Sequence, residues 1–292
     1  MLNLAANWSP ALKALSRRVT PPLNALKAPL DALTGTAIAE ARSCRTWAQA
    51  PFLLHGWGPS YRVGLPEIPS AAALAKFAVE SRSPYLSVHL DLQPEDLSIA
   101  PLRRVTGSVR NLCAASGLPV LLENMPHYRW SERSPFVTDP AFISEAVSVS
   151  GAGFLLDLGH ARVAAAHRGE DELGYIMALP LFEAVEIHLS GPRLEADGLR
   201  DRHFGLSERD WELLDVVLTR APKLSFLTLE YGGIPDSGFT SDGRAVRLSR
   251  NSQATLLEQL GRLDGLRKRE AGLGSRAPVM RARPGVFTRR YR

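Results

Sequence analysis

Nine His, Asp and Glu side chains occur in an ordered series, and six of them directly follow a short apolar run. The series is His55, His89, Glu123, Asp157, His160, His188, Asp201, His203 and Glu230. Imidazole nitrogens and carboxylate oxygens together bind zinc, iron(II) or manganese, whereas calcium prefers oxygen ligands alone. Carboxylates gathered at the ends of neighbouring strands would repel one another unless cations neutralised them. The series therefore predicts a metal site.

The number of candidate ligands favours more than one ion. Nine ligands exceed what one tetrahedral or octahedral ion can use while it keeps a position for water or substrate. We therefore expect two or three divalent ions, and the candidate catalytic residues are the carboxylates Glu123, Asp157 and Glu230. Such a site could activate an oxygen nucleophile for hydrolysis, or iron in it could bind and reduce dioxygen. The ligand types alone leave both reactions open.

The elements that would position these residues alternate along the chain. Short apolar runs cover residues 2–6, 24–28, 51–54, 85–88, 119–122, 153–156, 184–187 and 225–229. The clearest runs, LPVLLEN, GFLLDLGH, AVEIHLS and LSFLTLE, are nearly continuous in apolar character, as is typical of parallel strands buried on both faces. Stretches with helical spacing lie between them, including residues 71–80, 102–115, 140–149, 208–220 and 252–266.

Eight alternating βα units predict an α/β fold, a single closed (β/α)8 TIM barrel. No GxGxxG or GxxxxGK[ST] motif follows a strand, which argues against a nucleotide-binding fold. We expect the barrel over residues 1–266 and a basic, poorly ordered tail over residues 267–292. In a barrel of this type, reacting groups lie where strands pass into the βα loops, and most of the series falls there.

Composition limits the classes of partner. The net charge is +5, but residues 262–292 carry a balance of +8, which leaves residues 1–261 at −3. Because the barrel itself is not basic, we do not expect nucleic acid as a partner. No apolar run is long enough for a membrane span. Cys44 and Cys113 form no CxxC pair, so we interpret both as buried thiols. Residues 1–6 are apolar, but no basic region precedes them; we expect no secretory signal and a cytoplasmic protein.

The ordered ligand series resembles the trinuclear zinc site of endonuclease IV type enzymes, which belong to the xylose-isomerase-like superfamily of TIM barrels. That resemblance implies three groups of ligands. The first ion would be held by His55, His89 and Glu123, the second by Glu123, Asp157, His188 and Glu230, and the third by His160, Asp201 and His203.

The sequences around the ligands look more like the multinuclear non-haem iron family that contains the methanobactin-biosynthesis oxidase. They are LLHGWG, LSVHL, LLENMPHY, FLLDLGHARVAA, EIHLSG and LRDRH, and the similarity runs over residues 7–230. This resemblance implies iron as the metal, dioxygen as co-substrate and a Cys-containing, ribosomally made peptide or a small thiol as substrate. It also implies a partner protein that grips the peptide. The family commonly shows D-x-N-H where this chain has Asp157-Leu158-Gly159-His160.

Other functions fit parts of the same series. A sugar isomerase or epimerase would need one divalent ion, held by Glu123, Asp157, His188 and Glu230. An endonuclease IV-like phosphodiesterase would use zinc, and manganese also suits these ligand types. A barrel that only binds metal, without turnover, is a further alternative outside enzymology.

Four residues outside the series are candidate contacts to a peptide or small-molecule substrate. They are Asn7, Lys27, Asn124 and His127. Asn7 and Lys27 end the first two strands and Asn124 follows a proposed ligand, so each could alternatively hold a hydrogen bond behind the metal ligands.

Overall fold

Eight parallel strands close into a barrel in the computed structural model, which describes residues 2–30, 34–56, 70–92, 100–130, 135–231 and 250–274. The barrel strands are β1 (Asn3–Asn7), β2 (Ala25–Pro29), β3 (Phe52–Gly56), β4 (Leu86–His89), β5 (Val120–Glu123), β6 (Gly153–Asp157), β7 (Ala184–Leu189) and β10 (Phe226–Leu229). Their order around the barrel is β1-β10-β7-β6-β5-β4-β3-β2. All eight strands lie where the apolar runs predicted them, so the TIM-barrel prediction is confirmed.

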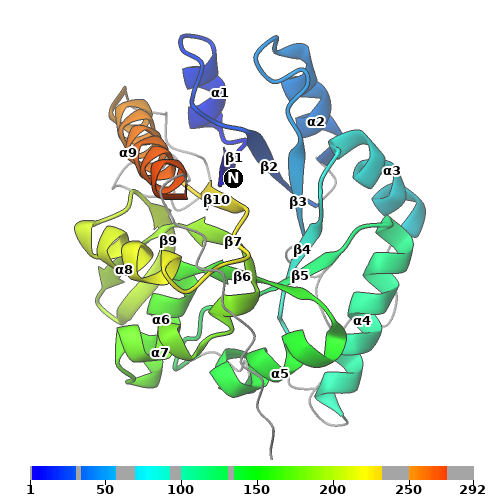
Figure 1. Ribbon diagram of the computed structural model, residues 1–292, viewed down its shortest axis with the longest axis vertical. Helices are drawn as coiled ribbons and strands as arrows, with labels where there is room; N and C mark the ends of the chain where they lie inside the picture. Colours follow the sequence, from blue (N-terminus) through cyan, green and yellow to red (C-terminus); the bar gives the residue numbers. More distant parts are fainter. Residues whose placement is uncertain are drawn as a thin grey trace, which may run out of the picture.

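Helices surround the barrel on the outside (Figure 1). They are α1 (Pro10–Ser16), α2 (Thr34–Ser43), α3 (Ala71–Ser81), α4 (Pro101–Ser116), α5 (Pro140–Ser150), α6 (Leu158–Arg168), α7 (Glu172–Ala178), α8 (Glu208–Leu218) and α9 (Arg250–Gly274), with short 3-10 turns at Pro135–Thr138 and Leu181–Glu183. Several begin at side chains that accept a hydrogen bond from the first turn, such as Ser9, Ser70 and Asp139. Across the described residues, none of these helices combines the length and apolar character that a membrane crossing requires.

Helix α9 is longer than the sequence predicted. It continues past residue 266 to Gly274, into the segment that we expected to be tail. Asp264 pairs there with Arg267 and with Lys268, three and four residues further on, and such spacing supports a helix. The rest of the expected tail, residues 275–292, lies outside the described residues.

Two apolar cores bury the strands on both faces. The larger one lies between the barrel and the helices and includes outward residues such as Leu54, Leu156 and Ile187. The smaller one fills one end of the barrel interior, with Ala5, Ala25, Leu53, Tyr85, Leu121, Leu155 and Phe226. Because side chains alternate along a strand, inward residues recur every two positions. Above this apolar layer come Lys27, Ser87, Glu186 and Thr228, all buried, and the candidate ligands follow at the carboxyl ends of the strands.

One element was not predicted. Asp201 and His203 fall outside the strands and helices expected from the sequence, and they lie on an antiparallel hairpin of β8 (Gly191–Glu195) and β9 (Gly198–Phe204), between β7 and α8. The segment is polar and lacks the apolar alternation of an isolated hairpin. Its partner is α6, which packs against both strands, so a tertiary contact stabilises it.

Candidate metal centre

All nine residues of the series lie at the carboxyl end of the barrel. His89, Glu123 and Asp157 are the last residues of β4, β5 and β6, and Glu230 directly follows β10. The remaining five come from β3 (His55), β7 (His188), the first turn of α6 (His160) and the hairpin strand β9 (Asp201 and His203). The structure thus brings together every residue that the sequence proposed as a ligand.

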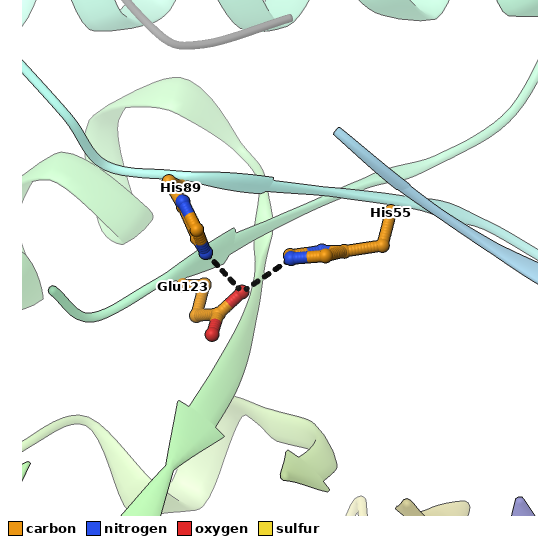
Figure 2. Close-up of side chains that lie close together, drawn as sticks. All are labelled: His55, His89 and Glu123. Atoms are coloured by element: carbon orange, nitrogen blue, oxygen red, sulfur yellow. Dashed lines mark ion pairs between the residues drawn. The ribbon is translucent and has the colours of Figure 1, made fainter. Parts of the chain in front are cut away.

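Glu123 lies at the centre of the group. Its Oε2 atom is 3.4 Å from the Nε2 atoms of both His55 and His89, as Figure 2 shows. Its Oε1 atom is 3.3 Å from His188 Nδ1 and 3.4 Å from His160 Nδ1. Neither oxygen has a hydrogen-bond partner among the described residues, although the side chain is only 1% exposed. Burying a carboxylate without hydrogen-bond partners costs free energy, and a cation beside it would offset that cost.

The second group gathers around His188. Its Nδ1 atom is 3.4 Å from Glu230 Oε1 and 3.8 Å from Asp157 Oδ2, in addition to its approach to Glu123. His188 and Asp157 are fully buried, and within the described part of the chain both His188 Nδ1 and Asp157 Oδ2 lack a hydrogen-bond partner. Three carboxylates therefore surround one imidazole nitrogen.

The third group joins the barrel to the hairpin. Asp201 Oδ2 is 3.3 Å from His160 Nε2 and 3.3 Å from His203 Nε2. His160 also lies near Glu123 and Asp157, and the three could form a group of their own. However, His160 Nδ1 is 2.9 Å from the carbonyl oxygen of Asn124, to which it donates. Its free lone pair is therefore on Nε2, which faces Asp201 more closely than it faces Asp157, 3.9 Å away.

These separations fit metal ligands better than hydrogen bonds. Hydrogen bonds between nitrogen and oxygen are usually about 2.7–3.2 Å long. Two ligand atoms each about 2.1 Å from one tetrahedral ion are about 3.4 Å apart. Most of the nitrogen–oxygen distances within the three groups are 3.3–3.4 Å. The donor types, their spacing and their unpartnered atoms all fit divalent cations.

Hydrogen bonds also orient the other imidazoles. His55 Nδ1 donates to Ser87 Oγ at 3.0 Å, because that hydroxyl donates in turn to Leu54 O. His203 Nδ1 donates to the carbonyl oxygen of Glu230 at 3.1 Å. Both rings therefore direct Nε2, the nitrogen available to a metal, toward the carboxylates. His188 has the opposite orientation: its Nε2 is 3.2 Å from Glu186 Oε1 and its Nδ1 faces the cage, as we call the nine candidate ligands together.

Comparison with known proteins identifies the family. A sequence model of the family described as "RiPP precursor modification enzyme MbnB/TglH/ChrH" matches residues 81–236, which include eight of the nine candidate ligands. The chain belongs to this family. RiPPs are ribosomally synthesised and post-translationally modified peptides, and the expected relationship to the methanobactin-type enzymes is thereby confirmed.

Curated relatives and solved structures agree with this placement. A UPF0276 protein of Bordetella pertussis is 33% identical over 151 residues, 50% of this chain and 52% of the relative. A UPF0276 protein of Rhizobium meliloti is 32% identical over 206 residues, 64% of this chain and 66% of the relative. The matches thus span about half to two thirds of these relatives.

Two solved structures share the fold. A D-tagatose 3-epimerase-like protein has a TM-score of 0.57 at 16% identity, with 90% of this chain and 99% of that chain covered. Endonuclease IV from Thermus thermophilus has a TM-score of 0.53 at 19% identity, with 88% of this chain and 99% of that chain covered. At these identities the likeness shows the barrel fold alone.

Gly159, at the position where the resemblance led us to expect asparagine, has a structural reason. A Cβ atom at Gly159 would lie 2.3 Å from Ser190 Oγ and 2.9 Å from the carbonyl oxygen of Ser190. Real Cβ atoms do not approach so closely, so any side chain here would displace Ser190 or the start of α6. The close approach of α6 to the end of β7 thus requires glycine, and it places His160 one turn beyond Asp157.

The charges of the cage residues depend on how their imidazoles and carboxylates pair with one another. Burial raises the pKa of Glu123, but the imidazoles of His89 and His188 outweigh it and hold that pKa well below its usual value. Burial raises the pKa of Asp157 to about 6 against the opposing effect of His160. Burial opposes the charged form of His188 too, yet Glu230, helped by Glu123, raises its pKa to about 10. In the metal-free cage, protons on imidazoles therefore balance the carboxylates, and divalent ions would replace these protons.

Two of the four candidate substrate contacts lie behind the ligands. Asn124 is fully buried; its Nδ2 donates to the carbonyl oxygen of Asp157 at 2.9 Å, and its Oδ1 accepts from the Asp157 amide at 2.8 Å. Lys27 is 1% exposed and donates to Glu186 Oε1 at 3.0 Å. Since Glu186 faces His188 Nε2, Lys27 and Asn124 both support ligand positions. The signal for this role was their place at or beside strand ends.

A cavity of about 640 Å³ opens above the three groups. Asn7, the third candidate contact, lines it, and so does Lys27, together with an apolar wall that includes Trp8, Met125 and Tyr128. His127, the fourth, is not among the described lining residues; burial and the charge of Arg168 lower its pKa. Sequence reasoning did not single out Trp8 and Met125 as lining residues, although both closely follow strand ends.

Proposed function

We propose that this chain is a multinuclear metal-dependent enzyme that oxidises a Cys-containing peptide or a small thiol at the expense of dioxygen. The observation that carries the proposal is Glu123, whose Oε2 atom faces His55 and His89 while its Oε1 atom faces His188. A carboxylate in this position can bridge two ions. With the third group around Asp201, the arrangement supports three sites, for which iron is favoured over zinc or manganese.

The substrate proposal rests on family membership and on the cavity. Relatives of this family are described as modifying RiPP precursors, so a peptide is the first substrate class to test. The cavity offers an apolar wall and a floor of candidate ligands. A short peptide segment with one thiol would fit both surfaces. A partner protein that holds the rest of the peptide, and a cytoplasmic location, stay predictions.

The chain's own residues have three tasks in this reaction. Trp8, Met125 and Tyr128 would bind the peptide and exclude water from the floor of the cavity. Asn124 would hold the Asp157 backbone and, through its carbonyl oxygen, the His160 ring. Iron(II) ions held by the nine residues would supply the electrons that reduce dioxygen and the positive charge that binds a thiolate. The protons that imidazoles carry in the metal-free cage would leave as ions bind.

The alternatives leave more of the site unexplained. A single-ion sugar isomerase would use Glu123, Asp157, His188 and Glu230, and five further converging residues would have no role. A DNA-repair phosphodiesterase would meet phosphates with a barrel whose charge over residues 1–261 is −3. Neither alternative is favoured by a specific contact.

The first experiment is elemental analysis of the full chain purified without oxygen and without added metal, followed by dioxygen uptake with Cys-containing peptides. Two or three irons per chain, together with uptake that requires the thiol, would support the proposal. Zinc alone would redirect it to hydrolysis, and one exchangeable manganese or magnesium to sugar isomerisation. Equal uptake with a Cys→Ser peptide would refute thiol oxidation.

A further inference from the structure

The third group of ligands depends on the hairpin rather than on the barrel. Asp201 and His203 come from β9, and their side chains are 14% and 36% exposed, whereas those of Glu123 and His188 are at most 1% exposed. A two-stranded hairpin is at best marginally stable by itself. Something outside the hairpin must therefore hold its two candidate ligands in place.

Three side chains grip the hairpin, and we call Tyr128, Trp130 and His167 the clasp. The Asp201 amide donates to the Tyr128 hydroxyl at 3.1 Å. His167 Nε2 donates to the carbonyl oxygen of Leu199 at 2.8 Å. Both hydrogen bonds thus hold the backbone of β9 at Asp201 or just before it.

Stacking completes the clasp. The Tyr128 and Trp130 rings stack, with centroids 5.3 Å apart and planes 21° apart, and the His167 ring meets both edge-on. The Arg200 guanidinium lies 4.2 Å from the Trp130 ring centroid and 5.1 Å from that of Tyr128. A Cβ atom at Gly198, where φ is +123°, would lie 2.8 Å from the His167 ring, so the clasp approaches the hairpin turn closely.

Backbone geometry shows why such a grip is needed. His203 has a φ of +51°, one of three non-glycine residues with positive φ among those described, and the one within the ligand series. Such a conformation is uncommon for a residue with a side chain and persists when surrounding contacts impose it. The clasp contacts lie within a few residues of His203 on the same strand.

We propose that the clasp is a positioning device that selectively sets the affinity of the third metal site, formed by His160, Asp201 and His203. This inference rests on the proposed multinuclear function. Tyr128 holds the backbone of Asp201, while the ligands of the other two ions come from barrel strands. Weakening the clasp therefore releases one ion and leaves two.

The test is anaerobic equilibrium dialysis of the full chain against iron(II), with elemental analysis, for the wild type, Tyr128→Phe and Tyr175→Phe. The first variant removes only the hydroxyl that accepts from Asp201. Tyr175→Phe is the matched control, because its buried hydroxyl donates to the Thr138 carbonyl away from the metal centre. We expect the third ion to bind about tenfold more weakly in Tyr128→Phe, and all three ions to bind normally in the control.

Hydrogen exchange gives a second readout of positioning. Amides of residues 198–204 should exchange faster in metal-free Tyr128→Phe than in the wild type or in Tyr175→Phe. Arg200→Gln, at a partly exposed side chain, removes the stack on Trp130 and should weaken the same ion; it decides the question if Tyr128→Phe does not fold.

Three unchanged affinities in Tyr128→Phe would overturn the clasp while leaving the proposed function intact. A loss of all three ions in step would overturn its selectivity. A wild-type chain that binds at most two ions would overturn the third site and the clasp together, whereas thiol-dependent dioxygen uptake would still test the oxidative function separately.

Discussion

Replacing Glu123 by glutamine tests the bridging carboxylate by exchanging one of its oxygen atoms for nitrogen. The side chain keeps its shape, but it loses its charge, and one of its two oxygens becomes an amide nitrogen that cannot bind a cation. Both oxygens now face imidazoles at 3.3–3.4 Å, so either orientation of the amide removes a ligand atom from one of the first two groups and leaves the other with a neutral carbonyl oxygen in place of a charged one. The third group does not use Glu123 in this arrangement. We therefore expect Glu123→Gln to retain one firmly bound ion.

The size of the effect follows from the ligand count. A structural zinc site contributes about 10–16 kcal/mol at neutral pH, shared among about four ligands, or about 2.5–4 kcal/mol for each. Loss of one ligand therefore weakens an ion by about 10²–10³-fold. Micromolar chelator should strip the first two ions from the variant while the wild type retains them.

The assay is ion content per chain after dialysis against graded chelator, with thermal unfolding measured with and without metal. Because bound ions stabilise only the folded state, the rise in Tm on adding metal should shrink in Glu123→Gln. Glu172→Gln is a suitable control, since Glu172 accepts from Arg162 and Arg209 outside the metal centre. Three ions of unchanged affinity in Glu123→Gln would refute the bridging role, as would an equal loss in Glu172→Gln.

Three further predictions follow from the same geometry. Metal affinity should rise from about pH 6 to about pH 9, by up to about tenfold per pH unit for each proton that a metal displaces. The reason is that the carboxylates outweigh burial and raise the pKa values of His188 and His203 to about 10 in the metal-free cage. Competition titrations measure this affinity, and a flat profile would contradict the prediction. Gly159→Asn, which inserts the residue common in the family, should lower the free energy of unfolding by roughly 1–3 kcal/mol, as thermal melts would show. Lys27→Met should lower it by about 3–5 kcal/mol in urea titrations, because it leaves the buried Glu186 carboxylate without its lysine partner; an unchanged midpoint would rule out that pairing.

The barrel strands and the polar residues at their carboxyl ends were predictable because each can be recognised from a few consecutive residues of the sequence. Strands buried on both faces are nearly continuous apolar runs, and each polar residue that ends such a run must lie at the same rim. Alternation adds detail: Ser87 and His89, like Thr228 and Glu230, are two residues apart and point into the same interior. The convergence of the strand-end ligands thus follows from strand order alone.

The hairpin and the clasp were not predictable in the same way. Residues 191–204 carry many charges, and the Asp197-Gly198 turn signal lacks flanking apolar alternation. What fixes the hairpin is its packing on α6, the hydrogen bond that it donates to Tyr128 and the one that it accepts from His167; both residues are distant in sequence. The glycine at position 159 could not be explained from the sequence either, because only the close approach of α6 to Ser190 accounts for it.

The polar layer between the apolar floor and the rim links stability to metal binding. A buried ion pair such as Lys27 with Glu186 adds little stability compared with apolar residues of similar volume, so stability alone does not explain it. Glu186, however, lies 3.2 Å from His188 Nε2 and accepts from Thr228. A carboxylate beside one nitrogen of an imidazole keeps the proton on that nitrogen. The lone pair of the other nitrogen then points toward a metal. Lys27 keeps that carboxylate charged, since its positive charge outweighs burial and lowers the Glu186 pKa far below its usual value. The buried charged layer of the barrel is therefore explained by the orientation of His188 that a second ion would need.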